Sequence, residues 1–477
     1  MTVEWKPKPS LPAPVLERGV LRWMMKNLFS SPFNVFLTLS GIAIIILVVP
    51  PFVRWALFDA AWIGNSRGAC DQMKEAGFPG ACWVFIRVRF GLFIYGFYPG
   101  PERWRVNMAF IVLFLSMFPI LAGAFYRHEK IEAVFCGLGV LTVLLLFGIG
   151  PGLFTLFYLV SPYLLPHASL RKVFATFDRG LIGLLIRGTI LAIWFLLVYF
   201  TAGKLGVTPA AGSIALLAAL LTLPLMFSNG LPVIVWRWFF LFMVYPVFAY
   251  YVLLGGVFGL SEVQTHYWGG LFLTLVVAGV GMATALPIGI LLALGRRSNM
   301  PVIKTLCVAF IELVRGVPLV SVLFMASVMF PLFLPEEVYF DKLLRALVGV
   351  SLFYAAYMAE VVRGGLQAIP KGQYEAARAL GWPYWKMMGL IILPQALRLV
   401  IPGLTNNFLS LLKDTTLVAV IGLMDVLGIV KAAMADVDWI GFVAEAYVFA
   451  AVLFWIFCFG ISRYSMRLEK KYHVNYR

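Results

Sequence analysis

The sequence predicts an all-α protein, a polytopic bundle of about 10–12 transmembrane helices. Hydrophobic residues make up 62% of the 477 and charged residues only 13%, so a water-soluble fold would lack the polar residues to cover its apolar surface. Apolar stretches of about 18 residues or more recur along the chain, and each can cross about 30 Å of hydrocarbon as a helix. No long stretch alternates at period two, as the strands of a transmembrane barrel would.

The N-terminal part begins with a polar stretch, 1–34, that is rich in proline and basic residues. No small-residue cleavage site follows the first apolar run, so we expect a cytoplasmic tail before an uncleaved span. Spans are expected at 35–53 and 107–125, and the basic stretch 127–130 then lies in the cytoplasm. The loop between them, at about 54–106, faces the oxidising side, where Cys70 and Cys82 form either a disulfide or two free thiols.

Later spans are clearest after residue 265. Residues 131–260 fit three to five helices, whose boundaries stay open because Pro-Gly, Ser-Pro and Asn-Gly pairs interrupt the apolar runs. Five spans then follow, with basic and acidic loops in alternation, at 268–294, 303–333, 344–362, 391–428 and 442–461. The fourth is too long for one straight crossing, so we expect a break near Pro402 or Thr416. The chain thus divides into the tail, an extension at 35–264 and a core at 265–471 that ends in the cytoplasm.

A polar loop at 363–390, between the third and fourth helices of the core, predicts a short cytoplasmic helix. Gly381 follows an alanine-rich turn at the position where helices often end in a left-handed residue, and Pro383 prevents continuation. Glu375 and Arg378 would offer polar contacts on this helix. The small side chains of this helix, which permit close approach by another protein, belong to Ala376, Ala377 and Ala379.

This loop carries a family resemblance. Glu375, Ala376, Ala377, Gly381, Ile391, Leu393 and Pro394 match the pattern EAA-x3-G-x9-I-x-LP of permease subunits of binding-protein-dependent ABC importers. Flanking residues look like the polar-amino-acid branch, among them the run from Arg315 to Pro318 and the run from Leu411 to Leu417. The resemblance covers 265–471 and implies a five-helix type I ABC importer permease core. The extension resembles permeases of the general L-amino-acid importers of Gram-negative bacteria.

The resemblance implies import of L-amino acids from the periplasm to the cytoplasm across a bacterial inner membrane. Its implied partners are an ABC ATPase subunit on the loop, a second, related permease chain, a periplasmic amino-acid-binding protein and membrane lipid. We expect no enzyme activity in this chain, because no GxxxxGK[ST] phosphate-binding loop is present. We also expect no cofactor, nucleic acid or metal: the basic residues are spread over loops, and the four histidines lack ligand spacing.

The candidate passage residues are charges within the core helices. Arg315 is predicted past the middle of its span, where a charge costs about 2.5–3.5 kcal/mol on insertion scales. It would therefore either pair with Glu312, three residues earlier on the same helix face, or contact a substrate carboxylate. Glu360 and Arg363 have the same spacing near a cytoplasmic end and favour a structural pair.

Lys413 and Asp414 interrupt an apolar helix and would mark a break at the passage or the subunit interface. The alternative function is an ion-coupled secondary amino-acid transporter. That class predicts related repeats in the two halves and carboxylates at the membrane midplane, whereas this chain combines a variable front half with one core that carries the pattern.

Overall fold

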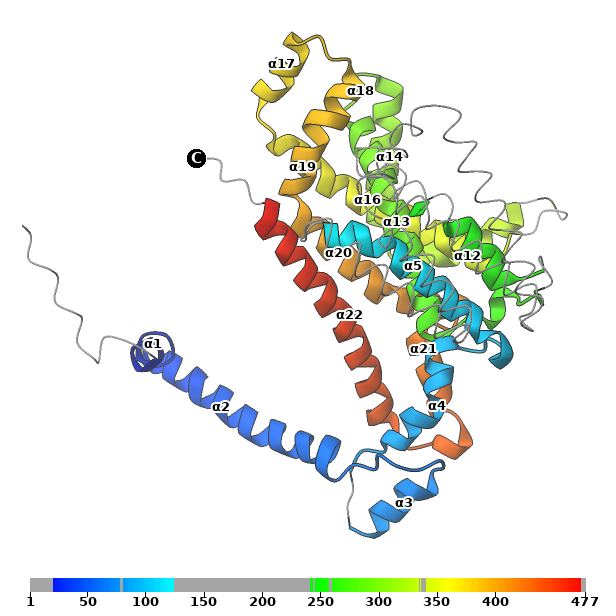
Figure 1. Cartoon of the computed structure of the whole chain (residues 1–477). Helices are drawn as coiled ribbons and strands as arrows, with labels where there is room; N and C mark the ends of the chain where they lie inside the picture. The colour runs from blue at the N-terminus through cyan, green and yellow to red at the C-terminus, as the bar shows by residue number, and fades with distance from the viewer. Residues whose placement is uncertain are drawn as a thin grey trace, which may run out of the picture. The chain divides into compact units, whose positions relative to one another are not determined.

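The computed structural model describes residues 20–77, 80–123 and 241–472, apart from short gaps at 243–244, 257–259, 334 and 336–339. These residues are mainly helical (Figure 1), and the extended bridges among them are isolated ones. They form two compact units. The first combines the residues up to Phe90 with Ala433–Phe449, and the second combines Gly91–Ala432 with the residues from Ala450 onward.

The first unit begins with α1 (Val20–Asn27) and the apolar helix α2 (Pro32–Val53). Ser31 caps α2, because its Oγ accepts a hydrogen bond from the backbone N–H of Asn34 at 3.2 Å. The helix continues into a π-helical turn at Arg54–Phe58 and is long and apolar enough to cross a membrane. The helix predicted at 35–53 is confirmed.

A clamped loop follows α2 and contains α3 (Gly68–Glu75) and the start of α4 (Trp83–Tyr95). Cys70 and Cys82 are joined in a disulfide, with Cα atoms 5.7 Å apart. Backbone N–H groups of Ala81 and Trp83 donate to carbonyls of the preceding segment, each at 2.9 Å. Gly80 is required here, because a Cβ on it would lie 1.9 Å from the carbonyl oxygen of Asp59. The loop is therefore held both covalently and by backbone bonds.

The second unit holds most of the remaining helices, which are α5 (Arg103–Gly123), α12 (Tyr245–Leu254), α13 (Gly270–Arg296), α14 (Pro301–Gly316), α15 (Leu319–Phe324), α16 (Lys342–Ala368), α17 (Lys371–Ala379), α18 (Tyr384–Met387), α19 (Leu393–Leu399), α20 (Ile401–Asp414) and α21 (Val426–Met434). The last helix, α22 (Val443–Tyr472), begins in the first unit. Four described helices can cross a membrane by length and composition, or six if each of two bent pairs is one span. The helices expected within 131–240 lie outside the described residues.

The centre of the second unit is the pair α13 and α16, which run parallel. Near their starts, the Thr265 hydroxyl, just before α13, bonds the carboxylate of Asp341, which caps α16, at 2.5 Å. Further along, a Cβ on Gly289 would lie 2.6 Å from the Cβ of Met358, so the two backbones approach closely where α13 has no side chain. This contact is part of a continuous buried core.

Two of the expected spans are bent. The prediction of one continuous helix at 303–333 is wrong. Helix α14 ends at Gly316, and the chain then turns by 107° into α15. Val317 is extended (φ −111°, ψ 139°), as residues before proline tend to be, and Pro318 has no N–H to continue the helix. In the stretch 391–428 the chain bends by 68° between α19 and α20, just before Pro402, and becomes 3-10 helical at Thr415–Ile421. Of the two alternatives, the break near Pro402 is confirmed, whereas at Thr416 the helix changes type but does not break.

Candidate functional site: the loop helix and the charge cluster beside it

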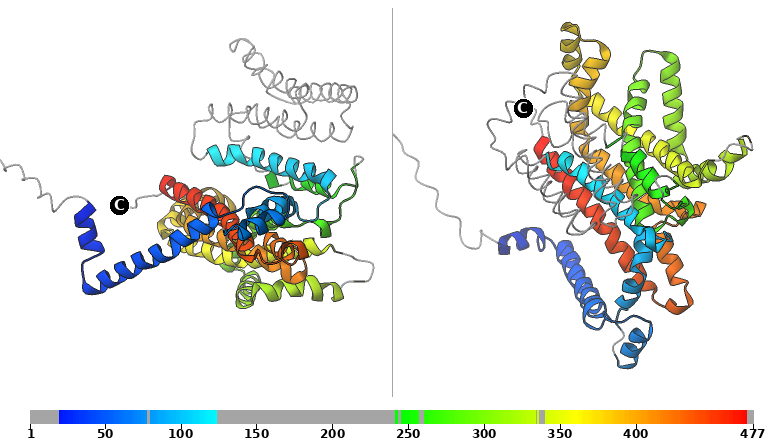
Figure 2. Two further views of the ribbon diagram at one scale, coloured as in Figure 1. Left: turned by 90° about the horizontal axis from the view of Figure 1, so that it is seen from below. Right: turned by 45° about the vertical axis from the view of Figure 1, so that its right-hand side comes forward.

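The predicted loop start at 363 is wrong, because α16 continues to Ala368; the loop that follows contains the predicted short helix, α17, and then α18. Figures 1 and 2 show these two helices projecting where α16 ends and α19 begins. Gly381 ends the turn in the left-handed region (φ 71°), and the next N–H, of Trp382, donates back to the carbonyl of Ala377 at 3.2 Å. The helix and its glycine stop are confirmed as predicted.

The seven residues of the sequence pattern occupy different environments. Glu375, Ala376 and Gly381 are exposed on the loop. Ala377 is only 2% exposed, so this alanine packs into its own unit and does not face solvent. The other three, Ile391, Leu393 and Pro394, are half-buried where a π-helical turn at Met388–Ile392 leads into α19.

Three large apolar side chains within residues 380–385 of this loop are exposed and were not anticipated. Leu380 is 73% exposed, Trp385 68% and Tyr384 46%. Exposed apolar side chains of this size are typical of a contact surface, either with another protein or with lipid. Their position after the alanine-rich turn was visible in the sequence, but their exposure depends on how α18 packs.

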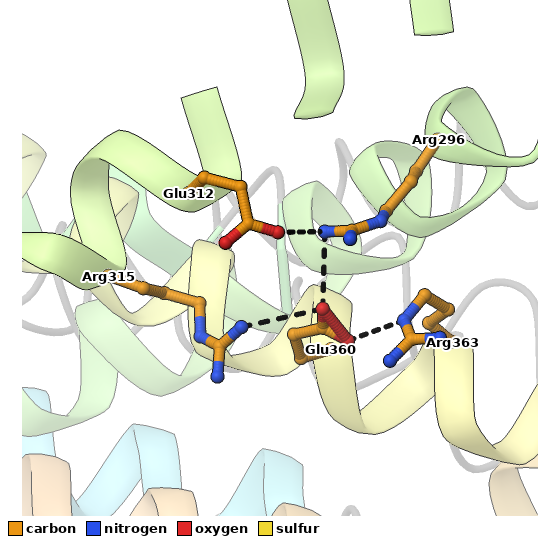
Figure 3. Close-up of polar contacts among 5 residues, drawn as sticks. All are labelled: Arg296, Glu312, Arg315, Glu360 and Arg363. Carbon is orange, nitrogen blue, oxygen red and sulfur yellow. Dashed lines mark hydrogen bonds and ion pairs between the residues drawn. The ribbon is translucent and has the colours of Figure 1, made fainter. Parts of the chain in front are cut away.

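A cluster of five charged side chains lies at the ends of α13, α14 and α16 (Figure 3). Glu360, in the last third of α16, accepts from Arg296 at 3.1 Å, Arg315 at 3.4 Å and Arg363 at 2.5 Å. Arg296 also bonds Glu312 at 2.9 Å. We call these five residues the Glu360 cluster. The structural pair predicted for Glu360 and Arg363 is confirmed.

The expected pairing of Glu312 with Arg315 is wrong. Arg315 turns to Glu360 and lies over the ring of Tyr357, with Cζ 5.6 Å from the centroid, while Glu312 bonds Arg296. Arg315, whose predicted depth in the membrane stays a prediction, is carried by the continuous helix α14 (Pro301–Gly316). It lies beside the final residue of α13, one residue before α14 ends, with its side chain about one-third exposed, 35%.

The second candidate pair separates into two environments. Asp414 is half-buried, and the hydroxyl of Tyr354 on α16 bonds its carboxylate. Lys413 is exposed. Close to Tyr354 in the chain, Ser351 shares a 2.7 Å hydrogen bond with Thr284 of α13, so polar side chains face one another between helices that are otherwise apolar. In the part of the chain that the structure describes, no group of three or more His, Cys, Asp and Glu side chains could hold a metal ion.

Long apolar helices, polar groups between them and a projecting capped loop helix are typical of the membrane subunit of a transport system. Comparison with known families agrees: residues 285–473 match the model of the binding-protein-dependent transport system inner membrane component. The chain is 41% identical over 466 residues to the inner membrane amino-acid ABC transporter permease protein YhdY of Escherichia coli (strain K12), covering 98% of this chain and 96% of that protein.

A second relative is the glutamate/glutamine/aspartate/asparagine transport system permease protein BztC of Rhodobacter capsulatus, 40% identical over 472 residues, covering 98% of this chain and 96% of that one. Among solved structures, an amino acid ABC transporter crystallised with histidines is 28% identical, with a TM-score of 0.38, covering 42% of this chain and 92% of that one. The chain belongs to the family of binding-protein-dependent transport system inner membrane components, and it is a multi-pass inner-membrane permease subunit.

Proposed function

We propose that this chain is the permease subunit of an ABC importer that moves L-amino acids from the periplasm to the cytoplasm. The observation that carries the proposal is the complete pattern from Glu375 to Pro394, whose first part forms a projecting helix that ends at a left-handed glycine. Two relatives that align over 96% of their own length are named as amino-acid transport permeases, and these names support the substrate class. ATP hydrolysis belongs to a separate subunit, a periplasmic binding protein delivers the substrate, and a second, related permease completes the passage. In this proposal both termini lie in the cytoplasm, the orientation that the basic loops favour.

The ATPase contact is proposed to centre on the exposed apolar residues of the loop. Trp385, Tyr384 and Leu380 would supply the buried anchors, since tryptophan and tyrosine dominate the energetics of many interfaces. Glu375 and Arg378 would form the polar rim around them. Ala377 contributes indirectly by packing α17 onto its own unit.

For the passage, we retain Arg315 as the proposed contact for the substrate carboxylate, with Glu360 as its resident partner. The ion pair between Arg315 and Glu360, at 3.4 Å, is the longest of the three that Glu360 makes. If Arg315 moves to a substrate, Glu360 remains paired with Arg296 and Arg363. An arginine can meet a carboxylate with two parallel hydrogen bonds. Lys413 and Asp414 stay candidates for the passage or for the interface with the second permease.

The test is reconstitution of the chain in proteoliposomes with its partner permease, ATPase and binding protein. We expect uptake of labelled amino acids to require ATP on the side of the membrane that the loop containing α17 faces. This uptake should continue when ionophores remove the ion gradients. Uptake that ionophores abolish and ATP does not support would instead establish the ion-coupled alternative.

The loop surface has its own test. Trp385→Ala is expected to weaken ATPase binding at least tenfold, as loss of an interface anchor does. The matched control is Trp455→Ala, which truncates an exposed tryptophan on α22, 61% exposed, and should leave ATPase binding unchanged. Equal binding by both variants would remove Trp385 from the interface.

A further inference from the structure

Two adjacent arginines end α13, and their side chains go to different partners. Arg296, the last residue of α13, bonds Glu312 and Glu360 within the Glu360 cluster (Figure 3). Arg297, the C-cap residue, bonds the carbonyl of Leu366 at 2.9 Å and the hydroxyl of Tyr374 at 3.1 Å. Tyr374 is on α17, so the end of α13 is connected directly to the loop helix.

The contact around Tyr374 is a closed triangle. Its hydroxyl donates to the Leu366 carbonyl at 3.0 Å while it accepts from Arg297, and the guanidinium lies over its ring at 5.5 Å from the centroid. Leu366 is in the last turn of α16, where helix carbonyls have no partner within the helix. The three residues therefore join the ends of α13 and α16 to α17 through one hydroxyl and one guanidinium.

The other side of this connection is the end of α14. Glu312 and Arg315 both lie in its last turns, directly before the chain bends by 107° at Val317 and Pro318. Both are bonded to residues of α13 or α16 in the Glu360 cluster. A shift of the α13 end thus changes the restraint on α14 immediately before its bend.

We propose that Arg297 and Tyr374 are positioning residues that relay movement of α17, through the adjacent Arg296 and the Glu360 cluster, to the bend between α14 and α15. Because Arg296 and Arg297 are consecutive, pulling the guanidinium of one displaces the backbone of the other. When α17 moves with the ATPase, the triangle carries the end of α13 along, and the cluster passes the displacement to α14. This relay rests on the proposed function, and it names the residues through which movement of the ATPase would reach the membrane helices.

Tyr374→Phe tests the relay with the smallest change, since it removes the hydroxyl and keeps the ring under Arg297. In proteoliposomes with the complete complex, we expect normal assembly but a ratio of ATP hydrolysed to amino acid imported that rises about fivefold, the effect of losing one hydrogen bond in the coupling step. Arg297→Lys, which keeps the charge, should raise the ratio less than Arg297→Gln. The matched control is Tyr250→Phe, at an exposed tyrosine of α12 that is 58% exposed.

A double change separates a relay from independent effects. If Tyr374 and Glu360 act in one path, Tyr374→Phe combined with Glu360→Gln should raise the ratio no more than the larger single change does. If the two sites act independently, the fold-increases of the single variants should multiply. A wild-type ratio in Tyr374→Phe, or multiplying effects in the double variant, overturns the relay alone. Absence of ATP-driven uptake in the unaltered complex overturns the proposed function and the relay with it.

Discussion

The backbone N–H of Cys82 donates to the carboxylate of Glu445 at 3.0 Å, although 363 residues separate them in the sequence. Glu445 lies in the first turn of α22 and is only 6% exposed, while Cys82 closes the disulfide with Cys70. The ring of Phe85 adds a contact with Trp439 just before α22, with centroids 5.2 Å apart. One short segment therefore ties the clamped loop to the start of the last helix.

The disulfide should be present in protein taken from the membrane. Mass spectrometry of unreduced, alkylated protein is expected to show Cys70 and Cys82 joined, and two alkylated thiols would contradict the bridge. Cys82→Ser should lower the free energy of unfolding of the first unit by about 3 kcal/mol on the loop-entropy model. Cys307→Ser, at a half-buried free thiol of α14, is the control and should have little effect.

The loop helix should depend on the conformation of Gly381. Gly381→Ala places a side chain at φ 71° and is expected to cost about 1 kcal/mol and to reduce uptake, although a Cβ there meets no neighbour. Gly372→Ala, in the helical part of α17 and equally open, should stabilise the helix slightly. Uptake normalised to inserted protein distinguishes the two, and equal uptake would show that the left-handed turn is not needed.

A changed charge on α17 or at the glycine that follows it should abolish coupling without removing the protein. Glu375→Lys and Gly381→Asp are expected to leave the chain inserted and abundant while ATP hydrolysis ceases to respond to the loaded binding protein. Immunoblots of membranes and ATPase assays of purified complexes measure the two effects. Normal transport in both variants would remove the docking role, and loss of uptake only through loss of protein would indicate a folding role.

Substituting Arg315 should affect uptake differently from substituting the other arginines of the Glu360 cluster. Arg315→Gln leaves Glu360 with two arginines, so assembly should survive, but loss of a charge-assisted carboxylate contact should lower uptake of chemically different amino acids by a similar factor, about 10- to 100-fold. Arg363→Gln removes a pair from the same carboxylate and serves as the control. If both variants reduce uptake equally, Arg315 acts only through the cluster.

Asp425 should stabilise the start of α21 as a cap. Its two carboxylate oxygens accept from the N–H groups of Gly428 at 2.8 Å and Leu427 at 3.2 Å, and the residue is fully buried. Burial raises the pKa of this carboxyl, against the lowering effect of these backbone bonds and of Lys431. The folded state therefore holds the proton more tightly than the unfolded state, and this contribution to stability is lost as pH rises through the folded pKa.

Asp425→Ala is accordingly expected to lower the free energy of unfolding by about 1 kcal/mol, measured by thermal melting in detergent. Asp425→Asn keeps one acceptor and removes the charge, so it should cost less and should flatten the dependence of melting on pH. A larger loss for Asn than for Ala would contradict the capping role.

Local rules found the features that depend on neighbouring residues. Pro402 predicted the bend before α20 because proline lacks an N–H, and Gly381 predicted the end of α17. The same proline rule applied to Pro318, but the apolar run on both sides suggested one continuous helix. Spacing of three residues correctly paired Glu360 with Arg363 and wrongly paired Glu312 with Arg315, because Arg296 and Glu360 arrive from other helices as competing partners. The exposure of Trp385 likewise depends on tertiary packing.

The tight contact of Gly289 with Met358 limits which parts of the bundle can shift during a cycle. A methyl group has no space there, because the carbonyl of Ala355 would lie only 3.0 Å from a Cβ on Gly289, so α13 and α16 are in direct backbone contact. We therefore expect the pair to move as one rigid strut, with changes in access coming from the elements hinged to it. Any substitution of Gly289 should accordingly spread this strut before it alters the surface that meets substrate.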